Sequence, residues 1–351
     1  MNALVDNMKY VEYKGEKYEL KEGFLDLGLC DITDITEIKK LDSLDLTNLE
    51  LSSNNIIEIK GLDKLRNLEI LNLGSNNIEV ISGLDNLSEL KTLHLASNSI
   101  SNISGLESLS GLEELYLRAN QLLEIKGLEK LTSLKKLDLS WNQISNLEGL
   151  ETLNNLEVLW IAGNQVIGIN GLEHTPNLKI LNLAGNKISK IGNLDTLTHL
   201  KELYLNDNNI TDLEGLEHLE ELETLWITGN KISQIKGLEQ CTNLKVLNLK
   251  DNSINKIEGL YTLTNLNKLF LSGNAIMDIE GLETLQTLET LDLGNNQIQE
   301  VKGLESLISL KDLWVYGNTI DETLLQQLGE LDSSGCALEP IKFVEYCLVN
   351  L

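Results

Sequence analysis

The residues best suited to chemistry in this sequence are aromatic side chains that recur at a fixed spacing. Trp226 stands between Leu225 and Ile227, two residues suited to a core. Successive side chains of a strand point to opposite faces, so a strand that buries Leu225 and Ile227 turns Trp226 towards water. The same position, taken every 22 residues, is occupied by His94, Tyr116, Asp138, Trp160, Asn182, Tyr204, Trp226, Asn248, Phe270, Asp292 and Trp314.

The chemistry that such a stripe of rings performs is binding. Six of these eleven residues are Tyr, Trp or Phe, although aromatic residues are only 4% of the composition. Packing between neighbouring strands explains one or two rings, whereas a contiguous exposed aromatic surface is typical of an interface. Burying one Trp or Tyr is worth about 4–6 kcal/mol before the costs of ordering. The pattern therefore predicts a face that binds a partner.

Charged residues share this predicted face with the rings. Its positions hold eight acidic and four basic residues, against 54 acidic and 28 basic residues in the whole chain, whose net charge is −26. A mixture of rings with charges of both signs suits a protein surface better than a polyanion or a small molecule. The residues predicted to bind the partner are Tyr116, Trp141, Trp160, Tyr204, Trp226, Phe270, Trp314, Tyr316, Glu114, Arg118, Asp138, Glu202 and Asp207.

The elements that must position these residues are repeats of 22 residues. Asparagine recurs thirteen times at this interval, from Asn54 to Asn318, within the pattern L-x-x-L-x-L-x-x-N-x-I-x-x-I-x-G-L-x-x-L. The L-x-L core predicts a short strand with both leucines inward, and the Asn amide suits a bend whose backbone groups need partners. The spacings of three that follow suit a loop and a tight or 3₁₀-like turn. Stacked units of this kind share one core, which predicts an α/β solenoid.

These residues resemble the leucine-rich-repeat family, in the 22-residue class typified by the regulatory leucine-rich subunit of protein phosphatase one and by the internalins. The resemblance covers about residues 25–320. It implies a curved horseshoe with a parallel sheet on the concave face and short loops with 3₁₀ or helical turns on the convex face. Accordingly we expect an N-terminal cap hairpin over 1–24, a degenerate first repeat over 25–46, thirteen repeats over 47–320, and a C-terminal helical cap over 321–351.

The resemblance also implies a non-catalytic scaffold that grips a protein in its concave face, with a Ser/Thr phosphatase catalytic subunit as a possible partner. The phosphatase-regulatory proteins close with Asn-Pro and a helix carrying Tyr-Arg, whereas this chain has "GNTIDETLLQQLGEL". That difference leaves the identity of the partner open. Two alternatives are an internalin-like surface recognition module and a structural spacer that assembles with itself.

Other signals in the sequence exclude several classes of function. The phosphate-loop, nucleophile-elbow and zinc-hydrolase motifs are missing, so we expect no enzyme, cofactor or metal. A ladder of carboxylates runs from Asp63 to Glu305 beside the Gly-Leu corners; it could bind calcium, although a favourable place in the first turn of a helical segment explains it more simply. The acidic charge disfavours nucleic acid and membrane surfaces. With no secretory pattern and four scattered cysteines, we expect a cytoplasmic monomer.

Overall fold

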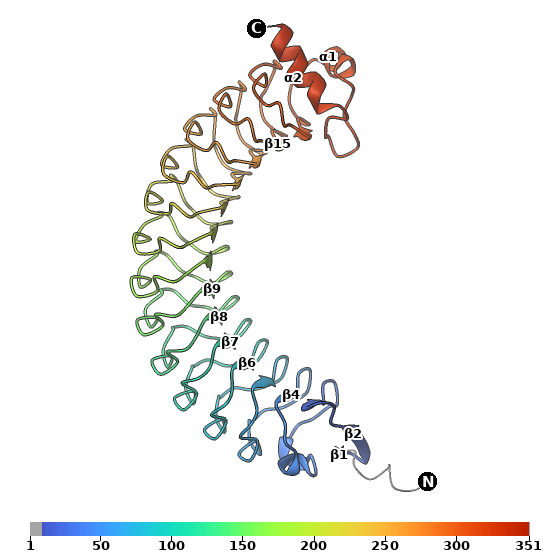
Figure 1. The fold of residues 1–351 in the computed structure, drawn as a ribbon, viewed down its shortest axis with the longest axis vertical. Coiled ribbons are helices and arrows are strands. Elements are labelled where there is room, and N and C mark those ends of the chain that lie inside the picture. Colours follow the sequence, from blue (N-terminus) through green and yellow to red (C-terminus); the bar gives the residue numbers. More distant parts are fainter. Residues whose placement is uncertain (1–8, 351) are drawn as a thin grey trace. The chain divides into compact units, whose positions relative to one another are not determined.

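The computed structural model describes residues 9–350 of the 351-residue chain. The chain divides into two compact units, Met1–Gln165 and Val166–Leu351, which are described separately. In each unit, short parallel strands lie along the inner, concave side of a curved stack, and the turns that connect them lie outside (Figure 1). No helix within residues 9–350 has the length and apolar character needed to cross a bilayer.

The first unit begins with an antiparallel hairpin of β1 (Tyr10–Tyr13) and β2 (Glu16–Glu19). Lys14 and Gly15 form its turn, with φ of 48° and 86°. Two positive φ values are typical of the tight hairpin turns whose twist matches that of the strands. Val11 and Tyr13 point inward and are buried. The hairpin therefore covers the first core layer, as the sequence around Lys14-Gly15 suggests, although residues 1–8 of the expected cap lie outside the described residues.

Seven parallel strands follow, joined by turns. Neighbouring strands pair at equivalent positions, as Leu93 does with Leu115. The connection from β3 (Phe24–Asp26) to β4 (Asn48–Glu50) is two residues longer than the regular repeat, because Leu25 pairs with Leu49. Two 3₁₀ segments, η1 (Ile35–Glu37) and η2 (Leu41–Ser43), occupy this longer connection. The strands are β3 (Phe24–Asp26), β4 (Asn48–Glu50), β5 (Ile70–Asn72), β6 (Thr92–His94), β7 (Glu114–Tyr116), β8 (Lys136–Asp138) and β9 (Val158–Trp160).

The second unit repeats this arrangement with seven more parallel strands. Its pairing is regular throughout, as in Leu203 with Leu225 and Leu225 with Leu247. Two helices, α1 (Glu322–Gln327) and α2 (Pro340–Val349), follow the last strand. The strands are β10 (Ile180–Asn182), β11 (Glu202–Tyr204), β12 (Thr224–Trp226), β13 (Val246–Asn248), β14 (Lys268–Phe270), β15 (Thr290–Asp292) and β16 (Asp312–Trp314).

The core of each unit consists of stacked layers of leucine and isoleucine. The return path of a repeat is made of successive tight turns, for example from Leu65 N–H to Leu62 C=O (2.9 Å) and from Leu68 N–H to Leu65 C=O (3.1 Å). A leucine every third residue thus meets the core at each corner. The predicted solenoid with a parallel sheet and short turns is confirmed.

The repeating asparagines connect each turn of the solenoid to the one before it. Asn230 is buried; its Oδ1 accepts a hydrogen bond from the N–H of Ile210 (3.0 Å), and its Nδ2 donates to the carbonyls of Leu205 (3.0 Å) and Ile227 (3.1 Å). One side chain therefore bonds to three buried backbone groups, and each of the two carbonyls also accepts from the next asparagine in the ladder, Asn208 or Asn252.

The C-terminal helices close the second unit in a way that the sequence predicts only in part. Helix α2 buries Phe343, Val344 and Cys347, but Leu348, expected on the same face, is 52% exposed. Leu351, the last residue expected there, lies outside the described residues. The expected division of the chain into caps and repeats stays a prediction.

A capping box from Thr319 to Glu322 is also suggested by the sequence, and this is wrong. Asp321 is the N-cap of α1, and its Oδ1 accepts a hydrogen bond from Leu324 N–H at 3.1 Å. The Thr319 hydroxyl instead donates to the carbonyl of Ile298 at 3.2 Å. That bond ties Thr319 to the last regular repeat, so the helix begins two residues later than the box requires.

Candidate functional site

Most of the predicted binding residues lie in the strands, on the sheet face opposite the leucine core, which is the concave face of each unit. The others follow their strands by two or three residues; they are Arg118, Trp141, Asp207 and Tyr316. In β12, Leu225 is fully buried while Trp226 on the other face is 37% exposed. Tyr116, Trp160, Tyr204, Phe270 and Trp314 hold the same position in their strands and are half-buried. Neighbouring rings and strand residues cover part of each ring, and the rest faces solvent.

In the first unit, three rings form a row along the sheet. His94 stacks on Tyr116 with centroids 4.3 Å apart and planes within 4°, and Tyr116 lies 6.5 Å from Trp160. Burial lowers the pKa of His94, which favours the neutral imidazole. The predicted site omits His94, although it occupies the same position in its repeat as Tyr116. Its spacing of 22 residues was the signal that could have included it.

Polar contacts hold this first row in place. The Tyr116 hydroxyl donates to Glu114 at 2.8 Å, and Lys136 pairs with the same carboxylate at 2.9 Å. Although desolvation opposes ionisation, these two contacts hold the pKa of Glu114 below its ordinary value. Asp138, between the Tyr116 and Trp160 strands, accepts from the N–H of Ser140 at 2.9 Å.

Trp141 adds a fourth ring to the first unit and has an unusual backbone. Its φ is 59°, a left-handed conformation that is an outlier for a bulky residue, and its side chain is 58% exposed. The ring lies over Gly163 in the next turn, where an added Cβ would be 2.9 Å from Trp141 Cδ2. Strain of this kind costs about 1–3 kcal/mol and occurs most often at functional sites.

The position of Trp141 follows a rule that holds in both units. The residue just before each repeating asparagine has a positive φ, and where its side chain is larger than serine it lies over a glycine in the next turn. Periodicity predicts the position but not the contact, which depends on the residue 22 places later. The pairs are Trp141 over Gly163, Asp207 over Gly229, Asp251 over Gly273 and Asn295 over Gly317.

The second unit has its own pair of rings at Tyr204 and Trp226. Their centroids are 6.3 Å apart and their planes are tilted by 46°. The Tyr204 hydroxyl donates to Glu202 at 2.7 Å, repeating the contact of Tyr116 with Glu114. Tyr204, Trp226 and Glu202 therefore form a fixed group rather than three independent side chains.

The Tyr204–Glu202 contact predicts a shift in titration. Burial and then the hydrogen bond to Glu202 raise the pKa of Tyr204 from 10.0 to about 12. Because the fold favours the neutral phenol, this contribution to stability is complete below pH ~10 and is lost as the pH rises towards 12. In Glu202→Gln we expect the pKa of Tyr204 to fall part of the way to 10.0, because burial remains.

Titration of the ring carbons by NMR measures this value directly. Glu239→Gln, which removes a half-buried charge from the outer side of the same unit, is the control and should leave the pKa of Tyr204 unchanged. An equal pKa in the wild type and in Glu202→Gln would contradict the assigned role of the carboxylate.

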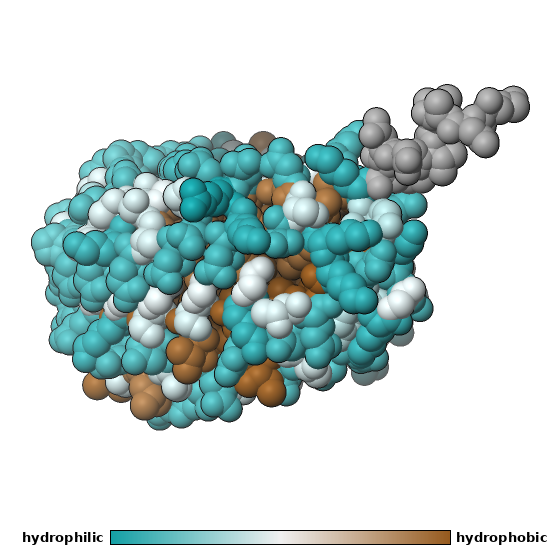
Figure 2. All heavy atoms as spheres, turned by 90° about the horizontal axis from the view of Figure 1, so that it is seen from below, coloured by the Kyte–Doolittle hydropathy of each residue, from teal (hydrophilic) through white to brown (hydrophobic). Residues whose placement is uncertain are grey.

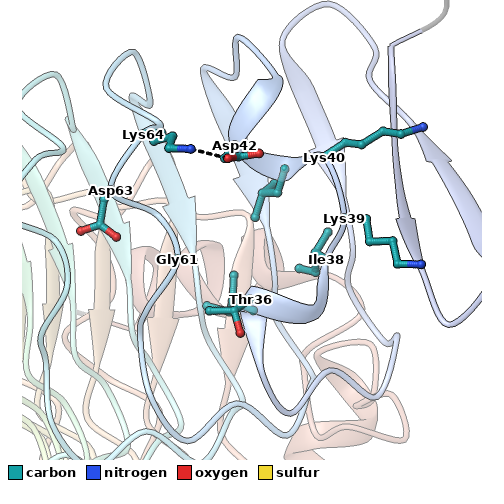
Figure 3. A pocket seen from close by; sticks show the side chains of 10 residues that line it. Thr36, Ile38, Lys39, Lys40, Asp42, Gly61, Asp63 and Lys64 are labelled. Atoms are coloured by element: carbon teal, nitrogen blue, oxygen red, sulfur yellow. Dashed lines mark hydrogen bonds and ion pairs between the residues drawn. The ribbon is translucent and has the colours of Figure 1, made fainter.

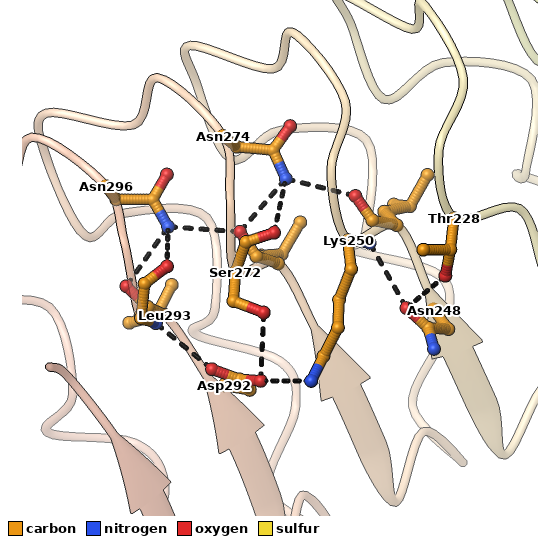
Figure 4. A network of polar contacts seen from close by, with 11 residues as sticks. Thr228, Asn248, Lys250, Ser272, Asn274, Asp292, Leu293 and Asn296 are labelled. Atoms are coloured by element: carbon orange, nitrogen blue, oxygen red, sulfur yellow. Dashed lines mark hydrogen bonds and ion pairs between the residues drawn. The ribbon is translucent and has the colours of Figure 1, made fainter. Parts of the chain in front are cut away.

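A buried ion pair organises the next part of the concave face. Lys250 Nζ lies 2.5 Å from Asp292 Oδ2, which also accepts from the Ser272 hydroxyl at 3.0 Å (Figure 4). The second oxygen of Asp292 accepts from the N–H of Gly294 at 3.0 Å. The Lys250 ammonium also lies 5.1 Å from the centroid of the Phe270 ring. This unit thus already holds one cation against a ring and a carboxylate.

The C-terminal cap contacts the last two predicted residues of the second unit, Trp314 and Tyr316. The backbone of Trp314 pairs with that of Cys336 in an antiparallel bridge. The Tyr316 ring packs closely against Gly294 and Gly335, whose added Cβ atoms would both collide with it. Tyr316 therefore has a packing role within the chain.

The charged residues Arg118 and Asp207 are exposed, and the side chain of neither makes a hydrogen bond or ion pair within residues 9–350. They lie near the rings of their own units and are accessible to a partner. Viewed from below in Figure 2, the visible surface is mostly hydrophilic, with hydrophobic atoms gathered in its middle and along one side.

The acidic ladder beside the glycine corners has a structural explanation that differs from the one expected. The repeats have tight turns there instead of a helical first turn. The carboxylates of Glu107 and Glu217 accept hydrogen bonds from the N–H groups of Gly105 and Gly215, two residues earlier, at 3.2 and 3.1 Å. Among the described residues, no group of three or more His, Cys, Asp or Glu is placed to hold a metal ion.

A pocket of about 360 Å³ lies beside η1 and η2, on the side of the turns (Figure 3). Ile35, Leu41 and Gly61 line it, together with Lys64 and Asp42, which form an ion pair at 2.5 Å. Both charged side chains are largely exposed, so this pair contributes little. No aromatic residue lines the pocket, and the concave face remains the candidate site.

Comparison with known families identifies the repeats. The family described as "Leucine Rich repeats (2 copies)" matches residues 66–108, 88–130, 110–153, 132–174, 154–196, 176–218, 198–240, 242–284 and 286–332. These segments cover more than half of the chain. A search of curated proteins found no match.

Solved structures give similar proteins over most of the chain. An internalin (inlF) from Listeria monocytogenes is 31% identical, with a TM-score of 0.73, over 82% of this chain and 86% of that one. The Leptospira interrogans LRR protein LIC12759 is 25% identical, with a TM-score of 0.72, over 87% and 92%. A TLR13–ssRNA13 complex is also 25% identical, with a TM-score of 0.72, over 85% of this chain and 51% of that one.

Proposed function

Because the chain belongs to the leucine-rich-repeat family, whose scaffold is typical of protein–protein recognition, we propose that it binds a partner protein through its concave aromatic residues. The observation that carries the proposal is the placement of the rings on the sheet face opposite a fully buried leucine core. Trp226 remains 37% exposed on that face, and Trp141 58%. Trp and Tyr are the residues that contribute most to binding at protein interfaces.

The rings are also held rigidly, which reduces the entropy lost on binding. Tyr116 is fixed by its stacking on His94 and by its hydrogen bond to Glu114. Tyr204 is fixed by Glu202 in the same manner. A partner that covers these rings therefore gains apolar contact without ordering them first.

The charge of the chain favours protein over RNA as the partner. The similar TLR13 structure is a complex with single-stranded RNA. This chain carries a net charge of −26, which repels a phosphate backbone. We therefore propose a protein partner and no catalytic reaction.

The test is capture from a lysate of the natural source, with Trp160→Ala/Trp226→Ala/Trp314→Ala compared with the wild type. We expect the wild type to capture a discrete protein and the triple variant to bind it about a hundredfold or more weakly, since each ring is a candidate hot spot. Tyr261→Ala is the control, because that ring is 63% exposed on the outer side. It should capture the partner normally.

Equal capture by the triple variant, at an unchanged melting temperature, would overturn the proposal. Purified Ser/Thr phosphatase catalytic subunit forms a separate arm of the test, because the sequence resemblance alone suggests it. The phosphatase, the cytoplasmic location and the monomeric state stay predictions.

A further inference from the structure

We propose that the concave face of the second unit binds a basic segment of the partner protein, with an arginine or lysine placed against Trp226 and between the carboxylates of Asp207 and Asp251. This inference rests on the proposed function and adds the chemistry of the partner. Asp207 and Asp251 belong to the turns on either side of the one that carries Trp226. A cation above that turn therefore lies beside the ring and between two turns that each carry a carboxylate.

The charges on the two concave faces differ. That of the first unit carries four acidic residues, Asp26 of β3 included, and two basic ones, a net charge of 4 − 2 = 2 negative. That of the second unit carries five acidic and two basic residues, a net of 5 − 2 = 3 negative. One of the two bases, Lys250, is already paired with Asp292. Charge complementarity thus favours a cationic ligand on the second unit. The five acidic residues of the second unit are Glu202, Asp207, Asp251, Asp292 and Asp312.

The two carboxylates that flank Trp226 are free to bind. Asp207 and Asp251 are exposed, and the carboxylate of neither forms a hydrogen bond or an ion pair within residues 9–350. Their left-handed backbones, with φ of 54° and 51°, are ones that aspartate tolerates. Gly229 lies between them, and an added Cβ there would be 2.5 Å from Asp207 Oδ1. The carboxylate of Asp207 therefore lies over Gly229, in the turn that carries Trp226, whereas that of Asp251 lies over Gly273 in the turn after its own.

The same unit already binds a cation of its own in the proposed way. Lys250 Nζ lies 5.1 Å from the Phe270 centroid and 2.5 Å from Asp292 Oδ2. Trp226 has a ring better suited to cations than phenylalanine, and no cation of the described chain lies over it. A basic side chain of the partner would repeat at Trp226 the arrangement that Lys250 makes at Phe270.

The test uses the full chain and a fluorescent peptide of repeated Arg-Gly-Ser units. Two matched peptides carry citrulline, which keeps the shape without the charge, or glutamate, which reverses it. Anisotropy titrations measure the dissociation constants at low and moderate salt. The test variants are Asp207→Asn/Asp251→Asn and Trp226→Ala. Glu173→Gln/Glu239→Gln removes the same charge from the outer side, and Tyr261→Ala removes an exposed ring from that side.

We expect the arginine peptide to bind and the citrulline and glutamate peptides to bind about tenfold or more weakly. Asp207→Asn/Asp251→Asn and Trp226→Ala should each weaken the arginine peptide by about tenfold. The outer-charge variant and Tyr261→Ala should stay within about twofold of the wild type. Added salt should weaken binding, because exposed charges are screened.

If Asp207→Asn/Asp251→Asn and the outer-charge variant weaken peptide binding equally, the binding depends only on the overall negative charge of the chain, and the inference is overturned. Full binding by Trp226→Ala, or a preference for the glutamate peptide, would also overturn it. The proposed function is judged separately by capture of the natural partner with the triple tryptophan variant. If the arginine peptide fails the test but the triple tryptophan variant loses the natural partner, the inference of a basic segment is rejected and the proposed concave binding face is retained.

Discussion

Replacing Gly149 by alanine is expected to destabilise the first unit by about 3–5 kcal/mol. Gly149 has a φ of 104°, a conformation that L-residues with a side chain rarely adopt. An added Cβ would collide with the carbonyl oxygen of Ile125 in the preceding turn. That atom belongs to the backbone, so relief requires the two turns to separate and opens the leucine layers between them.

The measurement is the denaturant midpoint, with hydrogen exchange reporting which turns are affected. Gly111→Ala is the matched control in the same unit. Gly111 has no positive φ, and the nearest atom to its added Cβ is the end of the flexible Lys91 side chain at 3.3 Å. We expect that control to be neutral or slightly stabilising, by up to about 1 kcal/mol. Equal midpoints for the two variants would contradict the steric account.

Replacing Asn230 by alanine is expected to cost about 2–4 kcal/mol in the second unit, because one orphaned buried group costs about 1–3 kcal/mol and further hydrogen bonds are lost with it. The substitution leaves the N–H of Ile210 without its acceptor. The carbonyls of Leu205 and Ile227 each lose one of two donors and keep the amide of the neighbouring asparagine, Asn208 or Asn252. Alanine also leaves a space that the tightly stacked turns cannot fill without moving.

Asn182→Ala is the control for this substitution. Asn182 is half-buried on the concave face and accepts one bond, from the N–H of Ala184 at 3.0 Å. We expect a loss of about 1 kcal/mol or less. In Asn230→Ala, the amide of Ile210 should exchange far faster, whereas in Asn182→Ala it should not. An unchanged exchange rate in Asn230→Ala would show that the ladder is not what protects it.

The fold was predictable because a single 22-residue pattern specifies the strand, the bend and the turn, and the pattern recurs along the chain without insertions. Leu225, Trp226 and Asn230 alone determine the core, the open face and the bend of their turn. The ends were less predictable because they leave the period. Asp321 replaces Thr319 as the helix cap, since Thr319 is already bonded to the last repeat.

The positions of the candidate site followed from the period, whereas its contacts did not. Tyr116 and Trp160 fall on the concave face by counting residues, but the stacking of His94 and the bond from Lys250 to Asp292 depend on how side chains lean between turns. The direction in which a side chain points between turns depends on the size of the residue in the neighbouring repeat and on which hydrogen-bonding or charged groups compete for it. A single repeat contains neither kind of information.

The left-handed position before each asparagine gives the array a direction. Trp141 lies over Gly163 in the next turn, and Asp207 lies over Gly229. A tandem copy of the Trp141 repeat inserted after itself would place a second indole where the first requires a glycine. A repeat of this kind can be duplicated only together with the repeat that follows it, because the following repeat supplies the glycine. For gene duplication and for protein engineering, the unit is therefore an ordered pair of repeats. Recombination or design that breaks this order would create a steric clash between the two repeats at the junction, even if each repeat folded correctly by itself.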